Sequence, residues 1–344
     1  MTKALVFKQV PKGFPVAGQD LAVEEVPFDA NADAPANGIV AKLLYASFDP
    51  YMRGRMRPAE VKSYSPAFDL GKPITTHAVA KVIKSNNSNY KPDDVVVGMF
   101  PLQEQVALPE QFNPYFRKLE NPLGLDLSLF IGALGMPGQT AYSSLYEIGK
   151  PKKGETIFVS SAAGAVGQLV GQLAKHEGLR VIGSVGSQEK LDFITKTLGF
   201  DGGFNYKTEK PLDALKRLCP NGIDIYYDNV GGEQLEAALA LMNEQGRLVE
   251  CGMISQYNNT PDKMYGIKNL FLVVTKRLKI EGFIVGDERF GPKWGDEHMK
   301  NVSKWIKEGT FTAQQHVTKG IDNAAEGLIG IFKGENFGKA VLEL

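Results

Sequence analysis

The segment from Glu155 to Gln168 constrains the fold most, because a short apolar run enters a turn of small residues and continues as an amphipathic helix. This order of strand, turn and helix seats the pyrophosphate of a dinucleotide on the amide groups of a helix N-terminus. We interpret four residues as the phosphate-binding turn: Gly164, Ala165, Val166 and Gly167. Ala162 replaces the first glycine of the usual G-x-G-x-x-G pattern, and such partial matches also occur in ordinary tight turns, so that alternative stays open.

The next strand along the chain indicates which dinucleotide binds. An NAD site places Asp or Glu at the tip of this strand to hold the ribose hydroxyls. Here the tip carries glycines and serines, among them Ser187, with Lys190 one helical turn further on. Hydroxyl donors and a positive charge suit a 2′-phosphate, so we predict NADPH rather than NADH. The alternative is that Lys190 is a solvated helix residue and that Glu189 faces the ribose.

Composition limits the class of partner and the location. The chain has 344 residues, enough for two cores, and its 39 Lys and Arg residues balance 39 Asp and Glu residues. This balance gives no indication of nucleic acid binding and favours a small-molecule substrate. Charged and amide residues interrupt the apolar stretches, and the N-terminus has no secretory pattern, so we expect a cytoplasmic protein without membrane contact.

Cysteine and histidine are too few and too dispersed for zinc. The chain has 2 cysteines, Cys219 and Cys251, and 4 histidines, none of them in a cluster with ligand spacing. Structural zinc needs four ligands and catalytic zinc needs three. We therefore predict no metal site and two reduced thiols.

The sequence divides into three stretches. Residues 1–126 hold short apolar runs separated by Pro, Gly and Asn, which is typical of a mostly β domain. Over residues 127–307, strand-like runs at 155–160, 180–184, 224–228, 247–252 and 279–285 alternate with helical runs such as 188–198 and 232–242. That alternation predicts an α/β fold with a doubly wound parallel sheet of the Rossmann type. Residues 308–344 end in a strand-like segment that would return to the first domain.

Four separate motifs give the chain a resemblance to a known family. Residues 46–53 (ASFDPYMR), 135–142 (GMPGQTAY), 228–232 (DNVGG) and 336–339 (NFGK) resemble the zinc-free branch of the medium-chain dehydrogenase/reductase superfamily. Within it they are most similar to the prostaglandin reductase, leukotriene dehydrogenase and alkenal double-bond reductase family. The resemblance implies a GroES-like catalytic domain, a Rossmann domain, a cofactor cleft between them, and NADPH-dependent reduction of the carbon–carbon double bond of α,β-unsaturated aldehydes and ketones.

The resemblance also implies roles for individual residues. Beyond the phosphate turn, Ser187 and Lys190, it assigns these residues to the cofactor: Tyr206, Asn229, Cys251, Gly252, Tyr257, Phe283 and Asn336. It assigns Tyr51, Met136 and Phe48 to the substrate pocket, and Phe48 stands where a smaller valine is expected. Tyr257 is our candidate for the hydrogen-bond donor to the substrate carbonyl, and Tyr51 for orienting the substrate. The donor of the α-carbon proton stays open, with solvent as one source. Ordinary packing is the alternative for Tyr51, Met136 and Tyr206, and a plain turn is the alternative for Asn229.

Other functions and the assembly stay open at this level. The same cleft would serve an NADPH quinone reductase, or a non-catalytic NADPH-binding protein that retains the fold. The sequence does not choose among short alkenals, phenylpropenals, long-chain enones and a biosynthetic enoyl intermediate, nor between detoxification and biosynthesis. Apolar residues 271–274 and 280–285 would leave an exposed hydrophobic edge on the sheet of a monomer, so we expect a homodimer. Arg53 and Arg55 are candidates for an acidic substrate tail, or else belong to a solvated loop.

Overall fold

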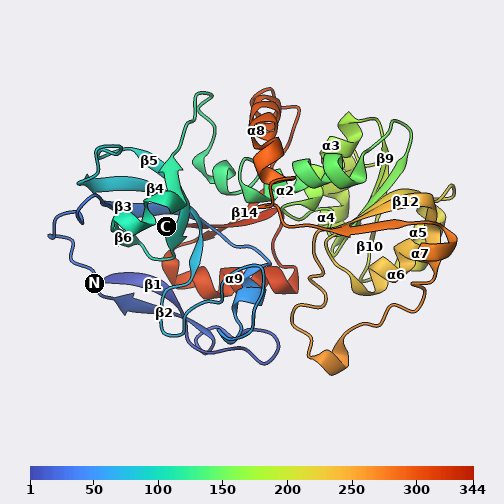
Figure 1. Cartoon of the computed structure of the whole chain (residues 1–344). Helices are drawn as coiled ribbons and strands as arrows, with labels where there is room; N and C mark the ends of the chain where they lie inside the picture. The colour runs from blue at the N-terminus through green and yellow to red at the C-terminus, as the bar shows by residue number, and fades with distance from the viewer. The chain divides into compact units, whose positions relative to one another are not determined.

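The computed structural model describes all 344 residues, which form two compact units (Figure 1). The β unit comprises Met1–Gly132, Gln315–Asn336 and Ala340–Leu344. The parallel-sheet unit comprises Ala133–Gln314 and Phe337–Lys339. The chain therefore leaves the first unit, builds the second and returns.

The β unit is built on a 7-stranded sheet in the order β14-β15-β3-β4-β5-β7, with β6 paired to β3 and with β1 and β2 as a separate pair. Neighbours β15 and β3, β3 and β4, β4 and β5, and β5 and β7 run antiparallel. Its strands are β1 (Thr2–Phe7), β2 (Leu21–Val26), β3 (Ile39–Ser47), β4 (Thr75–Ser85), β5 (Val95–Pro101), β6 (Gln105–Leu108), β7 (Phe116–Lys118), β14 (Gln315–Lys319) and β15 (Lys339–Glu343). Its two α-helices are α1 (Met52–Arg55) and α9 (Ala324–Lys333).

The parallel-sheet unit holds 6 strands in the order β10-β9-β8-β11-β12-β13. They are β8 (Thr156–Val159), β9 (Arg180–Val185), β10 (Gly202–Asn205), β11 (Ile223–Asp228), β12 (Met242–Glu250) and β13 (Lys279–Gly282). The chain moves outward from β8 through β9 to β10 and then continues on the other side with β11. The strand order thus reverses between β8 and β11, which is where open α/β sheets bind ligands beyond the carboxyl ends of their strands.

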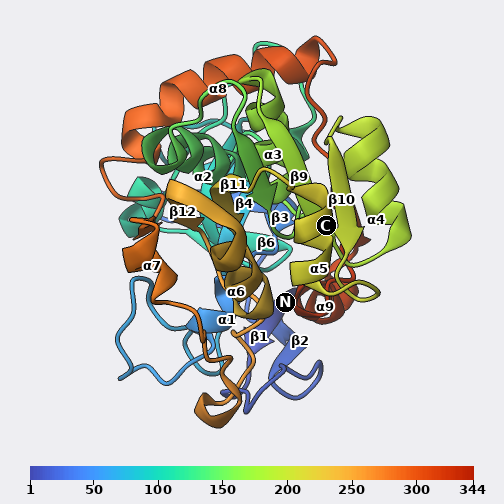
Figure 2. The same cartoon turned by 90° about the vertical axis from the view of Figure 1, so that its right-hand side faces the viewer.

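Helices cover both faces of the parallel sheet. In Figure 1, α2 (Met136–Ser144) and α3 (Gly167–His176) lie above the sheet, and α5 (Pro211–Leu218) and α6 (Gly232–Leu241) lie below it. The lower face has a buried core in which Phe158 stacks on Tyr226 with ring centroids 4.9 Å apart. Figure 2 shows α8 (Gly291–Lys307) along α2, where Tyr142 donates a 2.7 Å hydrogen bond to Glu297. The remaining helices are α4 (Gln188–Asp192) and α7 (Leu272–Thr275), with 3₁₀ or π turns at Glu110–Tyr115, Leu127–Ile131, Leu145–Gly149, Phe193–Thr197, Pro261–Lys263 and Ile321–Asn323.

The predicted fold class is confirmed, since a doubly wound parallel sheet accompanies a mostly β unit. The run predicted as one helix over 188–198 is α4 followed by a π turn, and β13 ends at Gly282, short of the predicted end of its strand. β10 was not predicted, because half of its four residues are glycines, which have low strand propensity. None of the helices is both long enough and apolar enough to cross a membrane.

Candidate active site

The phosphate-binding turn joins β8 to α3 at the point where the strand order reverses. The Gly164 N–H donates to the Ser161 carbonyl over 2.9 Å, which closes the turn. A Cβ on Gly167 would lie 2.3 Å from the Ser161 oxygen, so only glycine permits this approach of helix to strand. The close contact predicted for Gly167 is therefore present, and Ala165 and Val166 lead directly into α3.

The departure from the fingerprint at Ala162 has a counterpart on the neighbouring strand. A Cβ on Gly183 in β9 would lie 2.6 Å from the Ala162 Cβ. The methyl group of Ala162 therefore occupies space that Gly183 leaves empty. The loss of the first glycine in the pattern is thus compensated by a glycine on β9, and the turn keeps its form.

Two glutamines on α3 hold a segment of irregular chain beside this turn. Gln168 donates to the Gln314 carbonyl over 3.0 Å and accepts from its N–H over 2.9 Å. Gln172 repeats this pattern with Thr312, at 2.8 Å and 2.7 Å. Gly338 then donates to the Ala163 carbonyl over 3.0 Å, so the returning segment Phe337–Lys339 runs alongside the phosphate turn. Sequence reasoning missed this pair, although two glutamines four residues apart on an otherwise apolar helix were the available signal.

The structure brings the residues predicted for the 2′-phosphate together at the end of β9. Ser187 caps α4, with its hydroxyl oxygen accepting from the Lys190 N–H over 3.2 Å. Tyr206 follows β10, and its hydroxyl would lie 2.9 Å from a Cβ placed on Gly186. Burial lowers the pKa of Lys190, and the charge of nearby Lys207 lowers it further. Two adjacent cations favour an anionic ligand at this corner, and Lys207 is a member that the sequence prediction lacked.

The carboxyl ends of β11 and β12 lie next to each other in the sheet and carry three of the predicted cofactor residues, Asn229, Cys251 and Gly252. The Asn229 side-chain amide donates to the Ser160 carbonyl over 2.8 Å, which ties β11 to β8. The N–H groups of Cys251 and Gly252 both donate to the Asp228 carbonyl over 3.0 Å. Burial raises the pKa of the Cys251 thiol to about 12, so this cysteine is not a reactive thiolate.

Tyr257 folds back onto the end of β12. Its hydroxyl oxygen accepts a hydrogen bond of 3.1 Å from the Met253 N–H. A Cβ on Gly252 would lie 2.8 Å from the same oxygen. The Tyr257 hydroxyl is therefore held at the strand end by a backbone contact that depends on the absence of a side chain at position 252.

Three further predicted residues, Phe283, Met136 and Asn336, are half-buried. Phe283 follows β13 and packs on Phe290, with ring centroids 5.0 Å apart. Met136 begins α2, and its sulfur accepts from the Thr140 hydroxyl over 3.4 Å. Asn336 lies in the β unit directly before Phe337.

In the β unit, Tyr51 immediately precedes α1. Its hydroxyl is buried without a hydrogen-bond partner, and burial together with Asp49 raises its pKa well above the usual value, while Arg55 opposes that shift. Leaving a buried hydroxyl unpaired costs about 1–3 kcal/mol. Phe48 is 2% exposed, and a Cβ on Gly327 of α9 would lie 2.8 Å from its ring. Phe48 thus acts through packing, whereas Tyr51 retains an unused hydrogen-bonding group.

The guanidinium groups of the arginines after Tyr51 donate mainly to backbone carbonyls. Arg53 donates to Gly13 over 2.7 Å. Arg55 is 6% exposed, donates to Pro66 and Thr75 over 3.0 Å each, and stacks on Phe68. Arg57 donates to the carbonyls of Gly54, Val61 and Ser65. Arg55 and Arg57 fix the loop that follows α1, and Arg53 ties α1 to the segment at Gly13.

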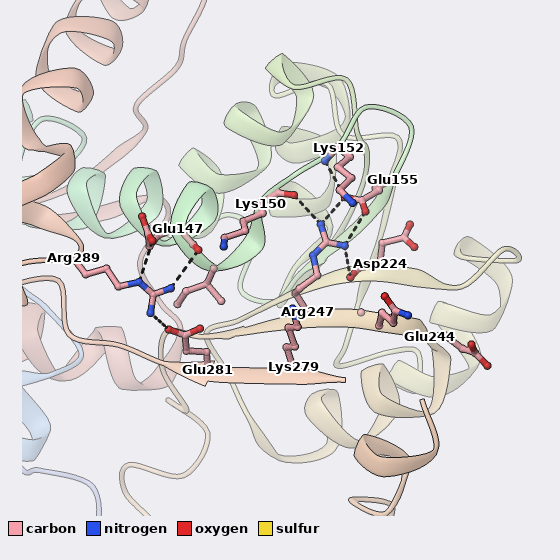
Figure 3. Close-up of a pocket in the computed structure, with 13 residues that line it drawn as sticks. Glu147, Lys150, Lys152, Glu155, Asp224, Glu244, Arg247, Lys279, Glu281 and Arg289 are labelled. Carbon is pink, nitrogen blue, oxygen red and sulfur yellow. Dashed lines mark hydrogen bonds and ion pairs between the residues drawn. The ribbon is translucent and has the colours of Figure 1, made fainter. Parts of the chain in front are cut away.

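A hollow of about 430 Å³ opens at the amino ends of the strands of the parallel sheet, opposite the ends that carry the candidate site (Figure 3). Its rim includes several charged side chains that pair with one another. Arg247 pairs with Glu155 over 2.7 Å, and Arg289 pairs with Glu147 over 3.0 Å and with Glu281. Ligands of such sheets bind at the carboxyl ends, so we assign this hollow to surface ion pairing rather than to the active site.

No group of three or more His, Cys, Asp or Glu residues in the structure is arranged to hold a metal ion. The glycine turn at the switch point and the cationic corner beyond β9 define a dinucleotide-binding unit. Residues 165–308 match the family model of the zinc-binding dehydrogenases, and residues 3–113 match the N-terminal domain of oxidoreductases.

Relatives that cover the whole chain narrow this class. The chain is 55% identical over 342 residues to the NADP-dependent oxidoreductase RED1 of Cochliobolus heterostrophus, covering 99% of this chain and 97% of that one. It is 43% identical over 343 residues to an NADP(+)-dependent 2-alkenal reductase of Nicotiana tabacum, covering 99% and 96%. The structure of CurA from Vibrio vulnificus in complex with NADPH is 33% identical with a TM-score of 0.90, covering 99% and 98%. The chain belongs to the medium-chain dehydrogenase/reductase superfamily and, within it, to the NADP-dependent alkenal double-bond reductases. The predicted family, the GroES-like N-terminal unit and NADP(H) as the cofactor are confirmed.

Proposed function

We propose that the protein reduces the carbon–carbon double bond of α,β-unsaturated aldehydes and ketones with NADPH. The observation that carries this proposal is the Tyr257 hydroxyl held at the carboxyl end of β12, in the same sheet as the cationic corner beyond β9. The name of the tobacco relative, a 2-alkenal reductase, supports the same reaction class.

The reaction needs a hydride at the β-carbon, a hydrogen-bond donor at the carbonyl oxygen and a proton at the α-carbon. Bound NADPH supplies the hydride. Ser187, Lys190, Lys207 and Tyr206 hold its 2′-phosphate, and the turn at Gly164–Gly167 holds its pyrophosphate.

Tyr257 acts on the carbonyl oxygen. Negative charge develops there as the hydride adds, and a neutral phenol stabilises that enolate by donating a hydrogen bond. The Tyr257 oxygen accepts a hydrogen bond from the Met253 N–H, and this contact fixes the position of the phenol. Such a fixed donor stabilises the transition state without reorganisation at the moment of reaction.

The remaining proposed roles concern the substrate. Tyr51 orients the carbonyl compound with its buried, unpaired hydroxyl, and Met136 provides an adaptable apolar wall. Phe48 restricts the size of the substrate through its packing. Water supplies the proton that the α-carbon takes up when the enolate collapses to the saturated carbonyl.

The test is to follow NADPH oxidation with a panel of enals, enones and quinones, with NADH as a parallel cofactor and product analysis for saturated carbonyls. We expect saturated aldehydes or ketones and a strong preference for NADPH. Turnover of quinones alone would make the protein a quinone reductase. Tight NADPH binding without turnover of any acceptor would make it a non-catalytic binding protein.

We further propose that the protein is a homodimer joined at the β13 edge of the parallel sheet. β13 is the last strand of the sheet, and the nearby α7 region exposes Phe271 by 64% and Val274 by 79%. An unpaired strand edge next to exposed apolar side chains favours pairing with another chain. Analytical ultracentrifugation should give twice the 37.6 kDa chain mass, and a monomer at all concentrations would contradict this assembly.

A further inference from the structure

Two buried carboxyl groups lie side by side at the carboxyl ends of β11 and β12, next to the candidate site. The reaction described above uses neither of them. Asp228 ends β11, Glu250 ends β12, and the two residues are register partners in the parallel pairing. Asp228 is fully buried. Both oxygens of Glu250 and the Oδ2 atom of Asp228 are buried without a hydrogen-bond partner.

The other oxygen of Asp228 is fully engaged. Oδ1 accepts hydrogen bonds from the Tyr226 hydroxyl at 2.7 Å, the Ser160 hydroxyl at 3.1 Å, and the N–H groups of Val230 and Gly231 at 2.8 Å each. The last two bonds shape the turn that carries Asn229. Because the Asp228 backbone carbonyl also accepts from Cys251 and Gly252, this one residue sets both chain segments that carry predicted cofactor residues at these strand ends.

No cation compensates the pair. Neither carboxyl group forms an ion pair, and the groups that face them are the Tyr226 hydroxyl and Ser160 hydroxyl and the Cys251 thiol. On β13, Lys279 is exposed and Glu281 is engaged with Arg289, while on α6 Glu233 is exposed. Two adjacent buried carboxylates without a cation cannot both be ionised at low cost.

One proton resolves this conflict. A protonated Glu250 carboxyl group is a hydrogen-bond donor instead of an acceptor. It can donate a hydrogen bond to the unpaired Oδ2 atom of Asp228. The Oδ1 atom of Asp228 accepts four hydrogen bonds and therefore stays unprotonated. Burial, and then the neighbouring Asp228 carboxylate, raise the pKa of Glu250 to about 8, and burial raises the pKa of Asp228.

We propose that Glu250 is a positioning residue that shares one proton with Asp228 and thereby holds the Asn229 turn and the Cys251–Gly252 segment in the form that binds NADPH. Loss of this proton places two negative charges side by side and drives the strand ends apart. The inference rests on the proposed cofactor site but not on the substrate, so each can fail separately.

The experiment compares NADPH affinity in wild type and in Glu250→Gln from about pH 6.5 to about pH 9.5. The amide group of a glutamine can still donate a hydrogen bond to Asp228, and it cannot ionise. We expect equal affinities at the lower pH, and a wild type that binds at least about fivefold more weakly than the variant at the higher pH. Glu244→Gln, on the exposed part of β12, is the matched control and should follow wild type. Titration of the 2′-phosphate and of Lys190 affects both proteins equally, so it cancels in the ratio of the two NADPH affinities at each pH.

If NADPH affinity changed with pH in the same way in wild type and in Glu250→Gln, the proposal would be overturned. A second measurement on the unaltered protein is independent of how the variant folds. The infrared carbonyl band of a protonated carboxyl group should be present at neutral pH and disappear as the pH rises through about 8. If no such band is found at neutral pH, the shared proton does not exist. A pH-dependent affinity in a protein that reduces no enal would uphold this inference and refute the proposed reaction.

Discussion

The hydroxyl oxygen of Tyr257 accepts a 3.1 Å hydrogen bond from the N–H of Met253, four residues earlier in the chain. The turn between them therefore orients the phenol through its own backbone. Removing the hydroxyl therefore tests the phenol as a hydrogen-bond donor while the ring and the turn remain.

Replacing Tyr257 with phenylalanine should lower kcat for an enal by about 10²-fold to 10³-fold, since one fixed donor to a developing oxyanion has that effect. NADPH affinity should change little, because the ring remains. Stopped-flow single turnovers and fluorescence titration of NADPH measure the two quantities. Tyr265→Phe, at a nearby exposed tyrosine, is the control. An unchanged kcat in Tyr257→Phe would remove this residue from the mechanism.

Replacing Gly252 with alanine should reduce kcat through Tyr257. The new Cβ would lie 2.8 Å from the Tyr257 hydroxyl oxygen, closer than such atoms can approach, so the phenol must move. The double variant Gly252→Ala, Tyr257→Phe should then be no slower than Tyr257→Phe alone. Additive losses in kcat would show that Gly252 acts independently of the tyrosine.

Replacing Lys190 with alanine should weaken NADPH binding by about 10-fold to 100-fold and leave NADH binding nearly unchanged. The reason is the loss of a charge-assisted contact that only the 2′-phosphate makes. Isothermal titration with both cofactors gives the two affinities. Lys196→Ala, whose exposed ammonium group is paired with Asp192, controls for the change in net charge. Equal losses for both cofactors would contradict the assignment of this corner to the phosphate.

Acid should destabilise the parallel-sheet unit through Glu147. Hydrogen bonds from Lys293, and then from Arg289 and Trp294, lower the pKa of this carboxyl group to about 2, against burial that opposes the shift. A lowered folded-state pKa means stability that is present above the unfolded value of 4.5 and is lost as the pH falls toward 2. Glu147→Gln should therefore melt below wild type at neutral pH, by about 2–4 °C, and converge with it near pH 2. A constant difference in Tm across this range would mean that ionisation of Glu147 does not contribute.

The sequence predicted what is decided locally. The turn at Gly164–Gly167 and the cap at Ser187 follow from residues a few positions apart, because helix starts and phosphate turns are made by neighbouring backbone groups. The carboxyl pair was not predicted, because Asp228 and Glu250 meet only through the register of two parallel strands. A charged residue in the otherwise apolar strand end before Cys251 was the available signal. The backbone contacts of the arginines after Tyr51 were not predicted for a similar reason, since no sequence pattern places the carbonyls that they bind.

Those arginines have a consequence for how the loop after α1 can vary. The guanidinium groups of Arg55 and Arg57 hold it through the carbonyl oxygens of Val61, Ser65 and Pro66, which every amino acid possesses. The side chains at positions 58–63 are exposed, and the hydrogen bonds of these arginines in the loop go to main-chain oxygens. Their identities can therefore be changed without loss of the contacts that hold the main chain, which makes this loop a natural place to graft new surface chemistry.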